Sequence, residues 1–285
     1  MFSRFKSLIL ILSLTLTAAL AVVAQQANPS APVNKPTPQK NEKAKIPKKE
    51  SKPQTVDLSK NATAEQVAET AIYFYGGGGG RENLKQIRRT TIEDGKLNII
   101  NASGANEQVN YERRIMRGDN LEKEKIRLDQ EFPNAKYALI YSDNKVVGLY
   151  NEAAFTPRED AAKAFQNQIW HGLEALLRYK ENGSTLQLIG REKVMGVDLY
   201  ILEVTDKENR KTKFYISAKT FRVLWLEYAE DGVKYTRRFY DYRYAQGTLV
   251  PYRTVLLADN KQIEEANIST STFGQKIDEE IFKAN

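Results

Sequence analysis

KTKFYISAKTFRVLWLEYAEDGVKYTRRFYDY, residues 211–242, is rich in aromatic and β-branched residues, a composition typical of β-strands. Residues 230–232 (Glu-Asp-Gly) interrupt it with the turn chemistry of a hairpin. The same pattern extends over residues 184–273, where Gln246-Gly247 and residues 258–260 supply further turns. An antiparallel sheet is therefore predicted here, with strands near 184–191, 199–205, 211–217, 222–228, 233–242, 249–257 and 263–272.

Upstream of this region the chain predicts five more strands. Asp119-Asn120 and Asp143-Asn144 are turn signals that separate alternating apolar and polar runs. Leu84 and Ile87 are expected to begin the first long strand, which continues through Ile92. The other four strands are predicted near 108–117, 122–128, 136–141 and 145–150.

Two helical segments flank this first group of strands. Thr63 and Gln66 have capping-box spacing at the start of one helix, which is predicted to stop at Gly76. The second is predicted from Thr156, as its N-cap, to about Lys180, with a kink at Gly172. The glycines 76–80 lack the Gly-Lys-Ser/Thr continuation of a phosphate loop, so they are interpreted as a helix stop and hinge.

These elements define a mainly β fold with a helical lid, in the α+β class. An antiparallel sheet of about eleven to twelve strands is too wide to stay flat and must curl. The helices carry an apolar stripe with no second sheet to cover. We therefore expect them on the concave face of the sheet.

The sequence offers few side chains for catalysis. It contains no cysteine and a single histidine, His171, which excludes a Cys nucleophile and argues against a Cys/His metal site. The adjacent acids Glu264 and Glu265 are expected to face solvent rather than to form a glycosidase pair. We expect no enzymatic activity, no catalytic residue, no metal and no cofactor.

The N-terminus indicates export. Arg4 and Lys6 precede a stretch of apolar, Ser and Thr residues from Leu8 to Val23, and Ala24 supplies the small residue before a cleavage point. Residues 1–24 are therefore predicted to be a signal peptide that directs the chain to the periplasm. An uncleaved inner-membrane anchor is the alternative, because the stretch is only slightly short for a membrane span.

Residues 25–60 are predicted to be a disordered tether rich in Lys and Pro, since they hold too few apolar residues to form a core. Residues 1–60 contain 10 Lys/Arg and 3 Asp/Glu, whereas residues 61–285 contain 33 of each. The net charge of +7 thus lies outside the predicted folded domain, 61–285. This argues against nucleic-acid binding and allows weak contact of the tether with an anionic membrane surface.

Several segments resemble one family, the bacterial outer-membrane lipoprotein-sorting proteins related to the periplasmic carrier LolA. The similarity covers most of residues 63–285 and is carried by 188–196 (LIGREKVMG), 200–204 (YILEV), 214–217 (FYIS), 239–242 (FYDY), Gly247 with Pro251, and 277–282. Gly79-Gly80 with Leu84 and Ile87 also resembles the family's entry to its first strand. The resemblance implies a half-open β-barrel whose helix-covered concave face binds acyl chains.

From this we expect a monomeric carrier that binds a lipid or an acylated protein in an apolar groove of the cell envelope, with a role in outer-membrane biogenesis. The alternative is an envelope lipid-sensing or protein-interaction module of the same fold, which an uncleaved anchor would tether to the membrane. The expected groove residues come from the helical segment and from facing strands: Phe165, Ile169, Trp170, Leu173 and Leu177, with Ile126, Leu128, Leu139, Tyr200, Leu202 and Trp225.

Overall fold

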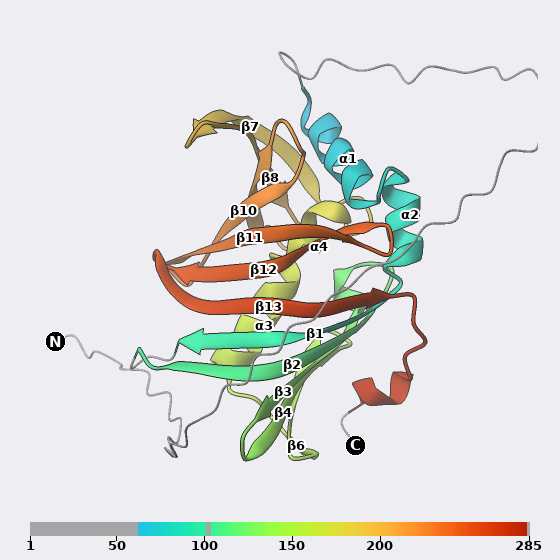
Figure 1. Cartoon of the computed structure of the whole chain (residues 1–285), viewed down its shortest axis with the longest axis vertical. Helices are drawn as coiled ribbons and strands as arrows, with labels where there is room; N and C mark the ends of the chain where they lie inside the picture. Colours follow the sequence, from blue (N-terminus) through green and yellow to red (C-terminus); the bar gives the residue numbers. More distant parts are fainter. Residues whose placement is uncertain (1–61, 101–103, 284–285) are drawn as a thin grey trace, which may run out of the picture. The chain divides into compact units, whose positions relative to one another are not determined.

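The computed structural model describes residues 62–100 and 104–283, and in this part of the chain it contains one antiparallel sheet of 13 strands. The spatial order is β6-β5-β4-β3-β2-β1-β13-β12-β11-β10-β9-β8-β7, so the strand pair β1 and β13 joins two sequential meanders (Figure 1). The strands are β1 (Thr90–Ile100), β2 (Asn106–Met116), β3 (Lys125–Phe132), β4 (Ala135–Ser142), β5 (Lys145–Tyr150), β6 (Ala153–Phe155), β7 (Thr185–Val194), β8 (Val197–Thr205), β9 (Lys211–Ser217), β10 (Val223–Glu230), β11 (Val233–Ala245), β12 (Thr248–Ala258) and β13 (Lys261–Phe273).

The predicted curled, open sheet is confirmed. Within the described residues β6 and β7 lie at opposite ends of the strand order and do not pair, so the sheet does not close into a barrel. The predicted hairpin turns are present, for example at Asp143-Asn144 and Asp259-Asn260, where all four residues have positive φ. The thirteenth strand is β6, which is only three residues long and therefore shows no alternation in the sequence.

The first helix, α1 (Ala64–Tyr75), begins with the predicted capping box. Thr63 Oγ1 accepts from the Gln66 backbone at 3.2 Å, and the Gln66 side chain accepts from the Thr63 backbone at 2.9 Å. Val67, Ala71 and Tyr75 form an apolar stripe along α1 and are fully buried, and the Tyr75 hydroxyl contacts the Tyr242 hydroxyl of β11 at 2.7 Å. The helix also contacts strands β7, β8 and β12, so it packs on this part of the sheet.

The prediction that Leu84 and Ile87 begin the first strand is wrong. Both lie in a second helix, α2 (Gly80–Ile87), and the strand begins only at Thr90. Leu84 is buried, and its spacing to Ile87 of three residues suits one face of a helix. The first β-branched pair, Thr90-Thr91, marks the true start of the strand.

The glycine run forms the tight turn between α1 and α2. Gly77 has a φ of +61°, and a Cβ atom there would lie 2.1 Å from the Gly247 carbonyl oxygen of the β11–β12 turn. Only glycine combines this conformation with this close approach.

The lid consists of two helices, α3 (Glu159–Trp170) and α4 (Leu173–Leu177), with the predicted break at Gly172. The expected N-cap at Thr156 is wrong, because the helix begins at Glu159 after Arg158, whose side chain makes no capping hydrogen bond. The expected start of a strand at residue 122 is also wrong. Leu121–Lys123 form a 3-10 turn, η1, in which Asn120 accepts from the Lys123 backbone at 3.1 Å.

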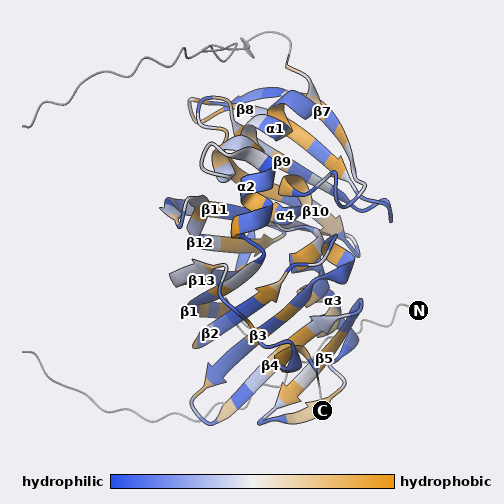
Figure 2. Ribbon diagram, turned by 90° about the vertical axis from the view of Figure 1, so that its right-hand side faces the viewer, coloured by the Kyte–Doolittle hydropathy of each residue, from blue (hydrophilic) through white to orange (hydrophobic). Residues whose placement is uncertain are grey.

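The lid helices and the last described turn, η2, lie on opposite faces of the sheet. Figure 2, turned by 90°, shows α3 on one side of strands along which hydrophobic and hydrophilic residues alternate. On the other side, η2 (Glu279–Phe282) follows Ile277, and both pack on Ala138 and Ile140 of β4.

No helix within the described ranges is both long and apolar enough to span a membrane. The same ranges hold no group of His, Cys, Asp or Glu placed to bind a metal.

Candidate ligand-binding cavity

A cavity lies between the concave face of the sheet and the lid helices. Its volume is about 190 Å³, and strands β1–β3 and β11–β13 form its floor while α3 and α4 cover it. One buried water needs about 10–15 Å³ by the same kind of measure, and an engineered apolar cavity of about 150 Å³ binds benzene. The cavity is thus large enough to accept an organic group.

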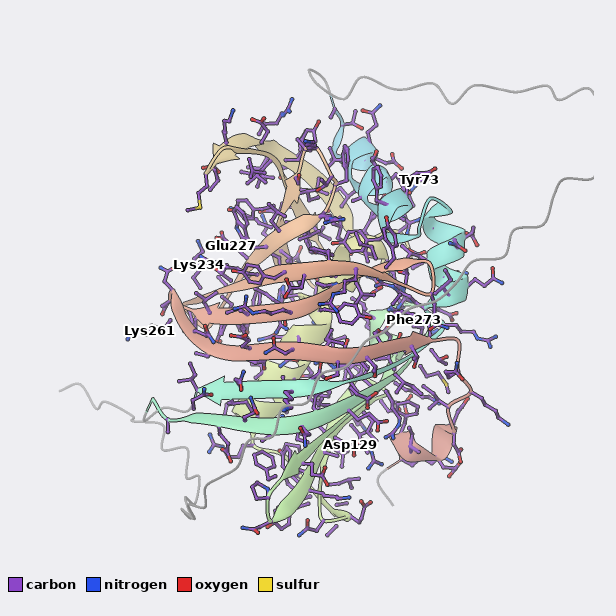
Figure 3. All side chains as sticks on the ribbon, in the orientation of Figure 1. Tyr73, Asp129, Glu227, Lys234, Lys261 and Phe273 are labelled. Carbon is purple, nitrogen blue, oxygen red and sulfur yellow. The ribbon has the colours of Figure 1, made fainter. Side chains whose placement is uncertain are left out.

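The greater part of its wall is apolar because the inward positions of alternate strand residues are branched or aromatic. Ile126 of β3 pairs with Ile115 of β2, and both face the cavity. Phe273, the last residue of β13, forms part of the cavity wall and is labelled in Figure 3. The apolar lining consists of Ile115, Leu121, Ile126, Phe165, Ile169, Leu173, Phe239, Val250, Pro251, Ala266, Ile268 and Phe273.

One end of the cavity is charged and tightly paired. Glu174 of α4 meets Arg88 at 2.7 Å and Arg117 at 2.8 Å, and Arg117 reaches Glu124 at 3.1 Å. Arg178 also pairs with Glu124. Burial would raise the pKa of Glu174, but the guanidinium charges of Arg117, Arg88 and Arg178 outweigh it and lower this pKa to about 2. Glu174 is therefore ionised at neutral pH and ties α4 to the sheet.

A second polar group lies further along the concave face. Arg113 meets Glu93 at 3.5 Å, and Arg237 of β11 lies 3.7 Å from Glu264 of β13. Gln168 of α3 donates to Glu264 at 3.4 Å. The expectation that Glu264 faces solvent is wrong, because it points inward to partners that are distant in the sequence.

Four of the expected groove residues line this cavity: Phe165 and Ile169 of α3, Leu173 of α4 and Ile126 of β3. Phe165, Ile169 and Ile126 are buried, whereas Leu173 is half-buried. The helical periodicity of the lid was a sufficient signal for three of them.

Other expected groove residues are buried outside the cavity wall. Leu128 and Leu139 are cross-strand neighbours on β3 and β4. Leu177, 2% exposed, borders a separate cleft between α2 and α4. Tyr200 and Leu202 of β8 belong to the part of the core that contacts α1.

Two expected residues with indole rings lie elsewhere. Trp225 of β10 is on the outer face, where its ring stacks on Tyr215 at 4.5 Å between centroids. A register shift in β10 between Val223 and Trp225 breaks the alternation, so the buried Val223 and Leu226 share one face and Trp225 lies on the other. Trp170 is half-buried and lies under the Arg210 guanidinium, 3.9 Å from the ring centroid.

The charged residues of the cavity were not found from the sequence. Arg113 and Arg237 stand next to Arg114 and Arg238, and each pair looks like a solvated run. Strand alternation places Arg113 and Arg237 inside while Arg238 is exposed on the outer face. The signal that was available is the alternation along each strand. Arg113 is two residues from the inward-facing Ile115, and Arg237 is two residues from the inward-facing Phe239.

Comparisons with known proteins agree with this architecture. A DUF1329 family protein from Desulfovibrio piger superposes with a TM-score of 0.56 at 13% sequence identity, over 78% of this chain and 98% of that protein. A LolA superfamily protein from Nitrosomonas europaea superposes with a TM-score of 0.54, with the same identity and coverage. No protein-family model and no curated protein matches the sequence itself. The chain therefore has a LolA-like fold, as its resemblance to the lipoprotein-sorting family predicted.

Proposed function

We propose that this protein is an exported, non-enzymatic carrier that holds an acyl chain of a lipid or an acylated protein in the cavity under α3 and α4. The observation that carries the proposal is the largely apolar cavity between the concave sheet and a two-helix lid. Its volume of about 190 Å³ admits several methylene groups but not a long chain. Uptake of a whole chain therefore requires the lid to move.

The contacts of α3 suit such a movement. Lys163 of α3 pairs with Glu230 and Asp231 at the exposed β10–β11 turn, and exposed pairs of this kind contribute little to stability. The Gln168–Glu264 hydrogen bond is long, at 3.4 Å. Because Gly172 separates α3 from the firmly paired α4, α3 is the part of the lid that opens in this proposal.

The test is uptake of a fluorescent fatty acid by the delipidated protein. We expect a saturable fluorescence increase that unlabelled dodecanoate competes away. A protein that takes up no acyl probe after delipidation would exclude the carrier function.

The envelope location is part of the same proposal. The signal peptide (1–24) and the tether (25–60) lie outside the described residues, so their roles remain as the sequence predicts them. Detection of the intact chain in a periplasmic fraction, with its N-terminus near Gln25, is the corresponding measurement.

An interaction module is a second candidate, and one surface favours it. Tyr73 and Phe74 of α1 are 51% and 37% exposed, and Tyr244 of β11 is 57% exposed (Tyr73 is labelled in Figure 3). The Tyr244 hydroxyl donates to the Phe74 carbonyl at 3.4 Å, so the aromatic residues form one patch. A photo-crosslinker at position 73 should then give a discrete protein adduct, whereas one at the exposed Tyr150 of β5 should not.

A further inference from the structure

Among the described residues, one buried arginine of the cavity has a guanidinium nitrogen that no hydrogen bond satisfies. Arg237 is 9% exposed and lines the cavity. Its Nη2 atom is buried and, among residues 62–100 and 104–283, has no hydrogen-bond partner. The carboxylate of Glu264 lies 3.7 Å from Nη1, which is beyond hydrogen-bonding distance. A buried donor left unpaired in this way costs free energy, so its position calls for a ligand atom.

Two other arginines of the cavity, Arg88 and Arg117, differ from Arg237 in this respect. Arg88 donates to Thr248, to the Leu249 carbonyl and to Glu174, at 2.7 to 2.9 Å. Arg117 donates to the Arg88 carbonyl at 2.6 Å and pairs with two glutamates. Their guanidinium groups are therefore occupied by the protein itself, whereas that of Arg237 keeps donor capacity for another group.

We propose that Arg237 binds the carboxylate of a fatty acid, or of another acyl compound with an acidic head, while the chain lies along Phe165, Ile169 and Ile126. This inference rests on the proposed carrier function and names the ligand class of the same cavity. The planar guanidinium fork matches a carboxylate in two parallel hydrogen bonds. A neutral ester or amide offers only acceptor oxygens without charge and binds a guanidinium less strongly.

One charge near the cavity competes with an anionic ligand. The lining of the cavity holds four arginines and three glutamates, and Glu264, which lies 3.7 Å from Arg237, is a fourth glutamate that balances the charges. A ligand carboxylate would therefore take the place of Glu264 as the partner of Arg237. Removing the charge of Glu264 should strengthen carboxylate binding specifically.

The first experiment uses the wild-type chain and compares dodecanoate with methyl dodecanoate by isothermal titration below micelle-forming concentrations. We expect the acid to bind about 10- to 100-fold more tightly, the effect of one charged hydrogen-bonding interaction. Equal affinities would overturn this inference and leave the carrier function standing. Failure of both ligands to bind would overturn the inference and the carrier function together.

The second experiment assigns the preference to its residue. Arg237→Met keeps an unbranched apolar stem but removes the guanidinium group, so it should reduce dodecanoate affinity to that of the ester, with ester affinity unchanged. Arg238→Met, on the same strand but exposed on the outer face, is the matched control and should keep the preference. An Arg237→Met protein that still prefers the acid would overturn the assignment.

Glu264→Gln keeps the test decisive if Arg237→Met does not fold. Glutamine can still accept the hydrogen bond from Gln168, so this variant should fold normally. The variant should bind dodecanoate several-fold more tightly than the wild type does. Its affinity for methyl dodecanoate should equal that of the wild type. An unchanged ratio of acid to ester affinity would contradict a carboxylate at Arg237.

Discussion

Glu174 and Arg88 meet at 2.7 Å, and this ion pair connects the short helix α4 of the lid to the residues that lead into the first strand. Arg117 binds the same carboxylate at 2.8 Å, so one glutamate joins two otherwise separate buried guanidinium groups. The lid is thereby fixed at α4, while α3 has only weak polar contacts. This difference between the two helices underlies the stability predictions.

We expect Glu174→Gln to destabilise the protein by about 3 kcal/mol or more, because it removes the charged partner of two buried arginines. Urea denaturation measures the change. Glu280→Gln, which removes an exposed pair with Lys283, is the control and should leave the stability nearly unchanged. Equal effects of the two substitutions would contradict the anchoring role of Glu174.

The two neighbouring leucines of α4 should respond differently to truncation. Leu176 is fully buried and does not border the cavity, so Leu176→Ala should cost roughly 2 to 5 kcal/mol. Leu173 is half-buried against the cavity, and Leu173→Ala should cost much less. The thermal unfolding of both variants provides the comparison.

Leu173→Asn separates binding from packing. A polar group at the cavity wall should abolish uptake of the fluorescent fatty acid and leave the melting temperature nearly unchanged. If this variant instead unfolds at a much lower temperature, Leu173 is an ordinary core residue and the cavity does not admit an acyl chain.

His171 should make stability depend on pH. Burial lowers its pKa to about 4, with a smaller contribution from Arg210, while Asp206 and Glu230 act in the opposite direction. The unfolded chain, with a pKa near 6.5, binds the proton first as the pH falls. Stability is thus fully present above pH 6.5 and decreases by roughly 3 kcal/mol between pH 6.5 and 4.

His171→Gln removes this titration and can still bond to Thr212, which lies 2.7 Å from His171 Nδ1. Urea unfolding of both proteins at several pH values isolates the histidine, because the carboxylates titrate in both. Parallel stability curves for the two proteins would show that His171 does not titrate in this range.

The predicted tether, residues 25–60, holds eight lysines and three acidic residues, a net charge of +5, whereas residues 61–285 are neutral. The mature chain, which begins near Gln25, should bind acidic liposomes weakly and lose this binding at high salt, at up to about 1 kcal/mol per lysine near the surface. A chain limited to residues 61–285 should not bind them at physiological salt. Equal binding of the two would assign membrane affinity to the folded domain instead.

Much of the fold followed from local patterns. Turn pairs such as Asp143-Asn144 and alternating apolar residues located twelve strands, and Thr63 with Gln66 located the start of α1. These signals involve only two to four consecutive residues, so they can be recognised in the sequence without the tertiary structure. The helical spacing of Phe165, Ile169 and Leu173 was legible for the same reason.

The faces of the strands depended on contacts between distant residues. A register shift of one residue put Trp225 on the outer face. Such a shift could not be predicted from the residues around Trp225. Arg237 and Glu264 lie 27 positions apart and come together only because β11, β12 and β13 are neighbours in the sheet. A charged residue can face inward only when its partner is in place across the sheet, and strand pairing alone brings that partner there.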